Sequence, residues 1–167
     1  MSDEGFGGAL DLSTADTKGF EPIPAGRYMH ELFDYSWDKT KGGANAKVPE
    51  GTPMLKLQFK CVEAPYENRR NFTQFVIPPA DYDKDKADKM KGMLVRFLVA
   101  MGLDESKVKS KNFKLNDALD DLIGEPVNLV LSVDPVPEGF ASAGEMKNNV
   151  KGFKAVGESV GATSGLL

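Results

Sequence analysis

The side chains best suited to binding chemistry in this sequence are cations at alternate positions of a predicted strand. Lys56 and Lys60 lie on one phase of residues 54–61, and apolar side chains fill the opposite phase. A period of two is typical of a strand with one buried and one exposed face. Arg69 and Arg70 begin the strand that we expect to return beside it. A cationic face on a curved sheet predicts a surface that binds a polyanion.

A second group of candidate binding residues lies near the C-terminus. Lys147, Lys151 and Phe153 share one phase of the strand predicted over residues 145–156. An aromatic ring among cations is typical of a residue that stacks on bases beside phosphate contacts. The alternative is that Phe153 packs in the core.

The loop over residues 38–53 adds Lys39, Lys41 and Lys47 among glycines, with no apolar period. Loops of this length inside a compact domain are usually functional. The sequence leaves two interpretations open: a flexible finger that closes over a polyanion, or a solvated loop.

Aromatic residues offer candidate stacking surfaces at two further places. Tyr35 and Trp37 end the strand predicted over residues 27–37, at the mouth of the long loop. We predict that Trp37 stacks on bases, although a core position is as compatible with its phase. Phe72 and Phe75 fall in opposite phases of one strand, so at least one of them must be buried.

The sequence argues against most catalytic centres. His30 and Cys61 are the only residues of their types, which is too few for a Cys/His metal site. No nucleophile elbow and no glycine-rich phosphate loop is present. The 25 acidic residues leave a carboxylate metal site open, but nothing clusters them. We therefore expect no enzyme and no cofactor. The net charge of −4 argues mildly against nucleic acid unless the cations gather locally.

Length and composition predict one domain between two tails. The 167 residues are 41% hydrophobic, which suffices for one core. We expect an acidic flexible arm over residues 1–20, a domain over 21–156 and a flexible tail over 157–167. No apolar run approaches ~20 residues, and the acidic start does not resemble a secretory signal. With a single cysteine, the chain fits a reducing cytoplasm.

The predicted elements are three strands, a helix, a short helix and two strands. This order predicts a mainly β fold with one or two helices, a five-stranded OB-fold-like Greek-key barrel with a helix between strands three and four. The first strand changes its apolar phase near Leu32, which predicts a bulge. The predicted bounds are strands over 27–37, 54 to about 62, 69–77, 127–133 and 145–156, a helix within 78–103 capped by Asp81 or Asp83, and a short helix from the N-cap Asn116 to Gly124.

Short motifs in a characteristic order resemble a phage family catalogued as a domain of unknown function and commonly described as single-stranded-DNA-binding proteins. The resemblance spans about residues 10–156 and implies an OB-like barrel that binds single strands without strong sequence preference. It also implies a role in phage replication or recombination, in the cytoplasm of the infected bacterium. The motifs are Phe20–Tyr28, Lys39–Gly42, Met54–Phe59, Tyr66–Arg69, Leu122–Gly124 and Asn148–Phe153.

Two features depart from that pattern. Many single-strand binders end in an acidic tip that recruits replication enzymes, whereas this tail holds one acid, Glu158, and ends in two leucines. The loop from Gly42 to Pro53 is also long. The alternative function is an adaptor that binds a recombinase, helicase or nuclease. The predicted contacts to single-stranded DNA are Trp37, Tyr35, Lys39, Lys41, Lys47, Lys56, Lys60, Arg69, Arg70, Lys147, Lys151 and Phe153.

Overall fold

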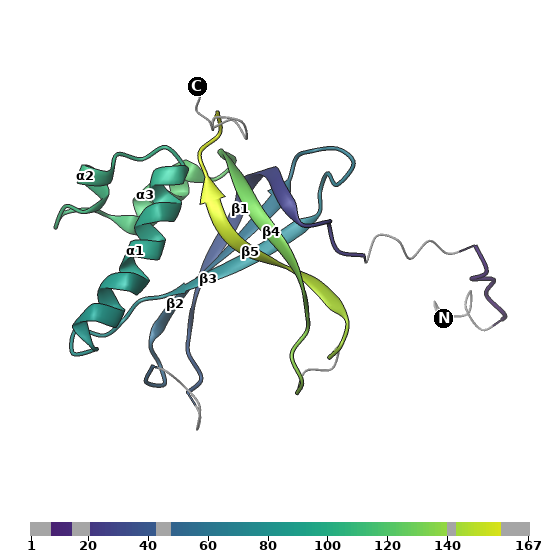
Figure 1. The fold of residues 1–167 in the computed structure, drawn as a ribbon, viewed down its shortest axis with the longest axis horizontal. Coiled ribbons are helices and arrows are strands. Elements are labelled where there is room, and N and C mark those ends of the chain that lie inside the picture. Colours follow the sequence, from purple (N-terminus) through teal and green to yellow (C-terminus); the bar gives the residue numbers. More distant parts are fainter. Residues whose placement is uncertain (1–7, 15–20, 43–47, 140–142, 158–167) are drawn as a thin grey trace.

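The computed structural model describes residues 8–14, 21–42, 48–139 and 143–157 (Figure 1). Its centre is one antiparallel sheet of five strands in the order β3-β2-β1-β4-β5. The helices lie together on one side of this sheet (Figure 1). The elements are β1 (Gly26–Lys39), β2 (Pro53–Cys61), β3 (Arg70–Val76), α1 (Lys84–Ala100), α2 (Glu105–Val108), α3 (Leu115–Leu122), β4 (Pro126–Pro135) and β5 (Met146–Lys154).

The mainly β class, the five strands and the helix between the third and fourth strands are confirmed. The prediction of one or two helices was wrong, because the described residues form three. The missed helix, α2, has only four residues, which is too short for an apolar period to mark it.

A bulge in β1 decides which side chains face the core. Leu32 pairs with Phe59, but the next pair joins Asp34 to Gln58, so Phe33 is the extra residue. Two residues on one strand then oppose one on the other, which reverses the phase of the side chains that follow. The bulge predicted near Leu32 is thus confirmed.

The core lies between the inner face of the sheet and α1. Phe97 of α1 is fully buried and lies 5.8 Å from Phe59, 5.9 Å from Phe75 and 5.1 Å from Phe153, measured between ring centroids. Such aromatic pairs add to the free energy gained from apolar burial, about 0.5–1.5 kcal/mol each. This cluster holds β2, β3 and β5 against one helix.

The starts of α1 and α3 differ in whether a side chain caps them. Asp83 caps α1, as predicted, by accepting a hydrogen bond from the Lys86 backbone N–H at 3.0 Å. The prediction that Asn116 caps α3 was wrong, because Lys114 holds that position and no side chain caps the helix. No helix in the described ranges has the length and apolar character needed to cross a membrane.

A short lead-in segment joins the two edge strands, β3 and β5. The Asn148 side chain of β5 accepts from the Ile23 N–H at 2.8 Å and donates to the Ile23 carbonyl at 2.7 Å. The Arg69 guanidinium, at the start of β3, donates to the Glu21 carbonyl. Ile23 is 1% exposed. The lead-in therefore closes one end of the core and fixes where the N-terminal arm leaves the domain.

Candidate nucleic-acid interface

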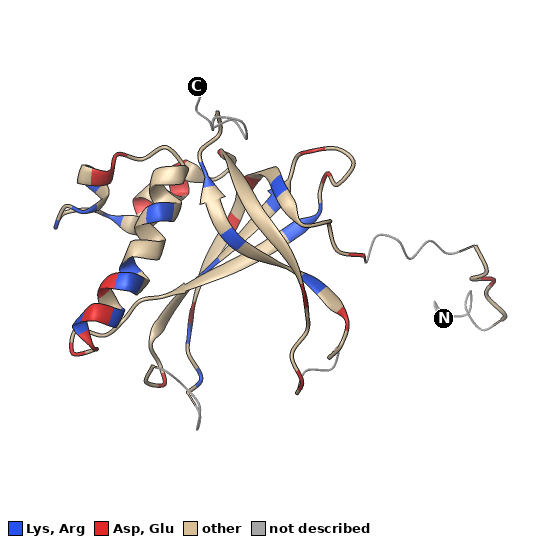
Figure 2. Cartoon of the chain, viewed as in Figure 1, with Lys and Arg blue, Asp and Glu red and all other residues tan. Residues whose placement is uncertain are grey.

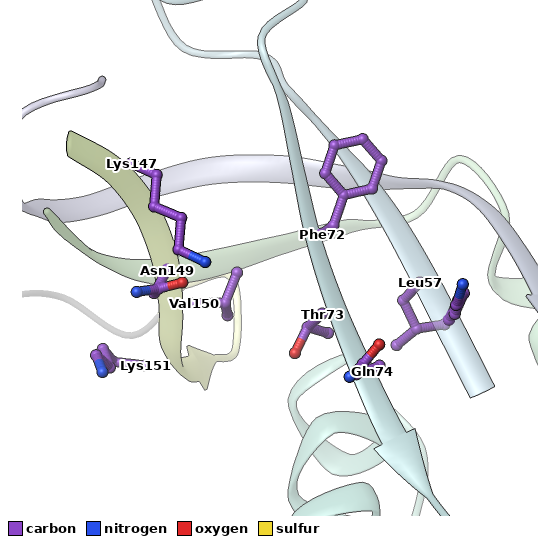
Figure 3. Close-up of a pocket in the computed structure, with 9 residues that line it drawn as sticks. Leu57, Phe72, Thr73, Gln74, Lys147, Asn149, Val150 and Lys151 are labelled. Atoms are coloured by element: carbon purple, nitrogen blue, oxygen red, sulfur yellow. The ribbon is translucent and has the colours of Figure 1, made fainter. Parts of the chain in front are cut away.

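An open hollow of about 610 Å³ lies between the edge strands β3 and β5. Lys147 and Asn149 of β5 line one side, and Phe72, Thr73 and Gln74 of β3 line the other (Figure 3). Edge strands also carry backbone N–H and C=O groups that lack a sheet partner. The hollow therefore offers apolar surface, amides and cations to one ligand. Its other lining residues are Lys56, Leu57, Val150 and Lys151.

Phe72 is the centre of a longer groove. Its side chain is 65% exposed, although an aromatic ring is usually buried. Phe72 also lines two adjoining hollows, one beside Gln58 of β2 and one beside Arg70 and Lys147. Phe75, in the opposite phase, is 5% exposed and belongs to the core. We call these three hollows together the β3–β5 groove.

A cation–aromatic stack stands beside the groove. The guanidinium carbon of Arg70 lies 3.8 Å from the ring centroid of Phe33, the extra residue of the β1 bulge. The Lys60 ammonium lies 5.6 Å from the same ring. Arg70 is the cross-strand partner of Lys60, so two like charges stand opposite each other and share one aromatic ring. The ring offsets part of their repulsion through cation–π attraction.

Acidic neighbours pair with several of these cations. The Lys56 ammonium lies 2.8 Å from Asp38, that of Lys60 lies 3.1 Å from Glu31, and that of Lys151 lies 3.7 Å from Asp134. A hydrogen bond from Lys56 holds the pKa of Asp38 below its usual value. These ion pairs are partly exposed, so each contributes little stability and its cation can exchange partners.

Lys147 differs from the other groove cations. Within the described residues its ammonium has no hydrogen bond and no salt bridge. Its cross-strand partner Asp134 accepts instead from Ser132 and Asn149, and these two hydrogen bonds are the main reason that the pKa of Asp134 is lowered. Figure 2 shows the Lys and Arg positions of the strands in blue and the Asp and Glu positions in red. Lys147 is therefore available to an anion at no cost in broken ion pairs.

The structure engages Tyr35 and Trp37 with a helix. After the bulge, Tyr35 pairs with Leu57 and Trp37 with Leu55, so both aromatic side chains lie on the inner face of the sheet. The Tyr35 hydroxyl donates to Asp120 at 2.6 Å, which raises the pKa of Tyr35. Trp37 Nε1 donates to the Asn116 side chain at 2.8 Å, and both partners belong to α3. These aromatics hold a helix against the sheet. Trp37 does not line the groove, and Tyr35 lines only its hollow beside Gln58.

Phe153 also lies on the inner face. It pairs with Leu129, which is fully buried, and its ring joins the cluster around Phe97. Phe153 therefore packs in the core, which was the alternative interpretation. It does not stand beside Lys147 and Lys151 as a stacking residue. The two lysines themselves do line the groove.

The remaining predicted residues lie at the margins. Lys39 ends β1 and Lys41 follows it in the loop, and both side chains are exposed without lining the groove. Lys47 lies outside the described residues. Arg69 lines the groove at the end where it holds the lead-in segment.

Four contributors were missed by sequence reasoning: Phe33, Phe72 and the amides Gln74 and Asn149. A signal for Phe72 exists, because it is two residues from Arg70 and therefore shares its exposed phase. For Phe33 the signal is weaker: the phase change near Leu32 indicates a bulge, but only the pairing with β2 identifies Phe33 as the extra residue, exposed at 40%.

His30 is fully buried and takes a structural role. Its Nδ1 lies 2.9 Å from the Tyr28 carbonyl and its Nε2 lies 2.9 Å from the Asn71 amide nitrogen. Donation from Nδ1 and acceptance at Nε2 satisfy both ring nitrogens of a neutral imidazole. Burial lowers the pKa of His30. No group of three acidic, His or Cys residues suited to a metal ion occurs in the described part of the chain.

Comparison with known proteins adds no family to this description. No protein-family model matches the chain, and no curated protein matches it. The resemblance to phage single-stranded-DNA-binding proteins stays a prediction.

Proposed function

We propose that this protein binds single-stranded DNA in the β3–β5 groove, without sequence preference and without catalysis. The observation that carries the proposal is the 65% exposed ring of Phe72, at the centre of a groove lined by Lys56, Lys147 and Lys151. Non-specific single-strand binding needs aromatic faces for bases and cations for phosphates, and the groove supplies both.

Each part of the groove has a separate task in this proposal. A base stacks on Phe72, which is worth roughly 1–3 kcal/mol per base. Arg70, held over Phe33, offers a second planar surface beside it. Lys147 binds a phosphate directly, and Lys56 and Lys151 exchange their carboxylate partners for phosphates.

The amides of the groove favour tolerance of sequence. Gln74 and Asn149 both line the main hollow beside Thr73. A side-chain amide both donates and accepts hydrogen bonds, and a hydroxyl does the same. Such groups can satisfy the edge of any base, so no single base is selected.

The arrangement of the strands supports a fold that suits this function. We infer an OB-fold-like Greek-key barrel, supported by the strand order β3-β2-β1-β4-β5 with β3 and β5 brought close together. The β1–β2 and β4–β5 hairpin ends project in the same direction (Figure 1). In an OB-fold these two loops flank the oligonucleotide. The proposed biological role is strand protection during phage replication or recombination, together with phage or host replication proteins.

A salt titration with two oligonucleotides tests this function. Fluorescence anisotropy of labelled oligo-dT should show binding that weakens steeply with salt, because each phosphate contact releases counterions. A duplex of equal length should bind much more weakly, since its base faces are stacked internally. Equal binding of both, or none to oligo-dT at low salt, would contradict the proposal and favour the adaptor function.

A further inference from the structure

A second concave surface lies along α1 and shares no residue with the β3–β5 groove. Two hollows of about 540 and 560 Å³ meet there, because both are lined by Gly92, Val95 and Lys109. We call them together the helix groove. The apolar lining of the larger hollow is Leu94, Val95, Leu98, Val108, Phe113 and Leu115.

Cations surround this apolar surface. Lys91 and Arg96 of α1 and Lys154 of β5 line it, and none of the three has a salt bridge within the described residues. The acids nearby are already engaged: Glu105 pairs with Lys109 at 3.0 Å, and Asp88 pairs with Lys84. In a chain with a net charge of −4, this local excess of positive charge selects an acidic, apolar ligand.

The N-terminal arm of the chain has that chemistry. Leu10 is 63% exposed and Leu12 is 66% exposed, with the acidic Asp11 between them. Residues 1–17 contain four acids and no Lys or Arg; the acids are Asp3, Glu4, Asp11 and Asp16. Two exposed leucines beside a carboxylate complement an apolar groove with a cationic rim.

The anchoring of the arm favours a second molecule as its receptor. Asn148 and Arg69 hold the lead-in segment near the start of β5. The helix groove lies at the other end of the same strand, where Phe153 and Lys154 line it. Six residues of strand separate Asn148 from Lys154, or about 20 Å. An arm that served its own domain would have to double back along this length.

We propose that residues 8–14 of one copy dock into the helix groove of a second copy, with Leu10 and Leu12 on the apolar floor and Asp11 toward the cationic rim. The two surfaces are different, so the contact is heterologous and can repeat from copy to copy. The result is an open row of domains. This inference does not depend on the proposed function, because neither surface belongs to the β3–β5 groove.

Sedimentation velocity of the full chain over a range of concentrations tests the proposal. We expect the average mass to rise with concentration. It should stay that of a monomer for the arm variant Leu10→Ser/Leu12→Ser and for the groove variant Arg96→Glu/Lys154→Glu, with dissociation constants raised at least ~10-fold. The control Lys86→Glu, an exposed α1 residue outside the groove, should associate like the parent chain.

Complementation makes the test independent of folding defects. The arm variant keeps its groove and the groove variant keeps its arm, so an equal mixture should form one-to-one dimers that neither variant forms alone. The proposal is overturned if the parent chain stays monomeric at every concentration. This holds even if a labelled peptide of residues 1–17 binds the chain, because the groove would then be filled by the arm of the same molecule. Association that both variants retain would also overturn it.

Discussion

Arg70 stacks on Phe33, with 3.8 Å between the guanidinium carbon and the ring centroid. A guanidinium is planar and stacks on bases as well as on rings, whereas an ammonium is a point charge. Arg70→Lys should therefore weaken oligo-dT binding about 3- to 10-fold, a loss of about 0.7–1.4 kcal/mol in binding free energy. Its salt dependence should stay unchanged, because the charge is kept. Lys60→Arg is the matched control and should not lose affinity.

Lys147 should account for one phosphate contact. Because its ammonium is unpaired within the described residues, Lys147→Gln removes a charge without freeing a carboxylate. The slope of log affinity against log salt should become shallower by about 0.7, the value for one phosphate of a single strand. Lys86→Gln, away from the groove, should leave the slope as it is. An unchanged slope for Lys147→Gln would remove this residue from the interface.

Trp37 should matter for stability and not for DNA affinity. Asn116→Ala removes the 2.8 Å hydrogen bond from Trp37 Nε1 and should lower the free energy of unfolding by about 0.5–1.5 kcal/mol. As the only tryptophan, Trp37 should report this loss through its own fluorescence during urea unfolding. Affinity for oligo-dT, measured where both chains are folded, should change less than about twofold. A larger loss of affinity would return Trp37 to the binding site.

His30 should make stability depend on pH near neutrality. Burial lowers its pKa below the ordinary 6.5, while Glu63 opposes this shift. As pH falls through 6.5, the unfolded chain gains a proton that the folded chain excludes. The contribution of neutral His30 to the free energy of unfolding is therefore complete above pH 6.5. It decreases below pH 6.5, by at most about 1.4 kcal/mol per pH unit.

Urea unfolding between pH 7.5 and pH 5 measures this slope. The lowered pKa values of Asp38 and Asp134 act only below 3.8 and leave this window to His30. His30→Gln should be less stable at every pH, since its contacts with Tyr28 and Asn71 change, but its stability should vary little across the window. An equal slope in this variant would mean that another group titrates.

The strands and α1 were predictable because their signals are local. Alternation from Leu55 to Cys61 marks β2, and Asp83 marks the start of α1. The phase change near Leu32 even indicated the bulge. Each of these features depends on neighbours within a few residues, which a sequence displays directly.

The site was harder because its side chains depend on pairing. Tyr35 and Trp37 belong to the inner face only once the register places them opposite Leu57 and Leu55. Asn116 has the chemistry of a helix cap, but its side chain is used by Trp37. In β3, Phe72 shares the phase of Arg70, which indicates that it is exposed. Phe75 lies in the opposite phase and is just as apolar, so the sequence alone did not show which ring is buried.

The most direct test of the groove is the affinity of Phe72→Ala for oligo-dT, compared with Met93→Ala. Both side chains are more than half exposed, and Met93 lies on α1 outside the β3–β5 groove. Thermal unfolding should be similar for the two variants, because neither residue is in the core. We predict that Phe72→Ala raises the dissociation constant about 5- to 100-fold, as the loss of one stacked base requires, and that Met93→Ala leaves it unchanged. Equal affinity of both variants would contradict the account, because Phe72 would then be an exposed ring that no base uses.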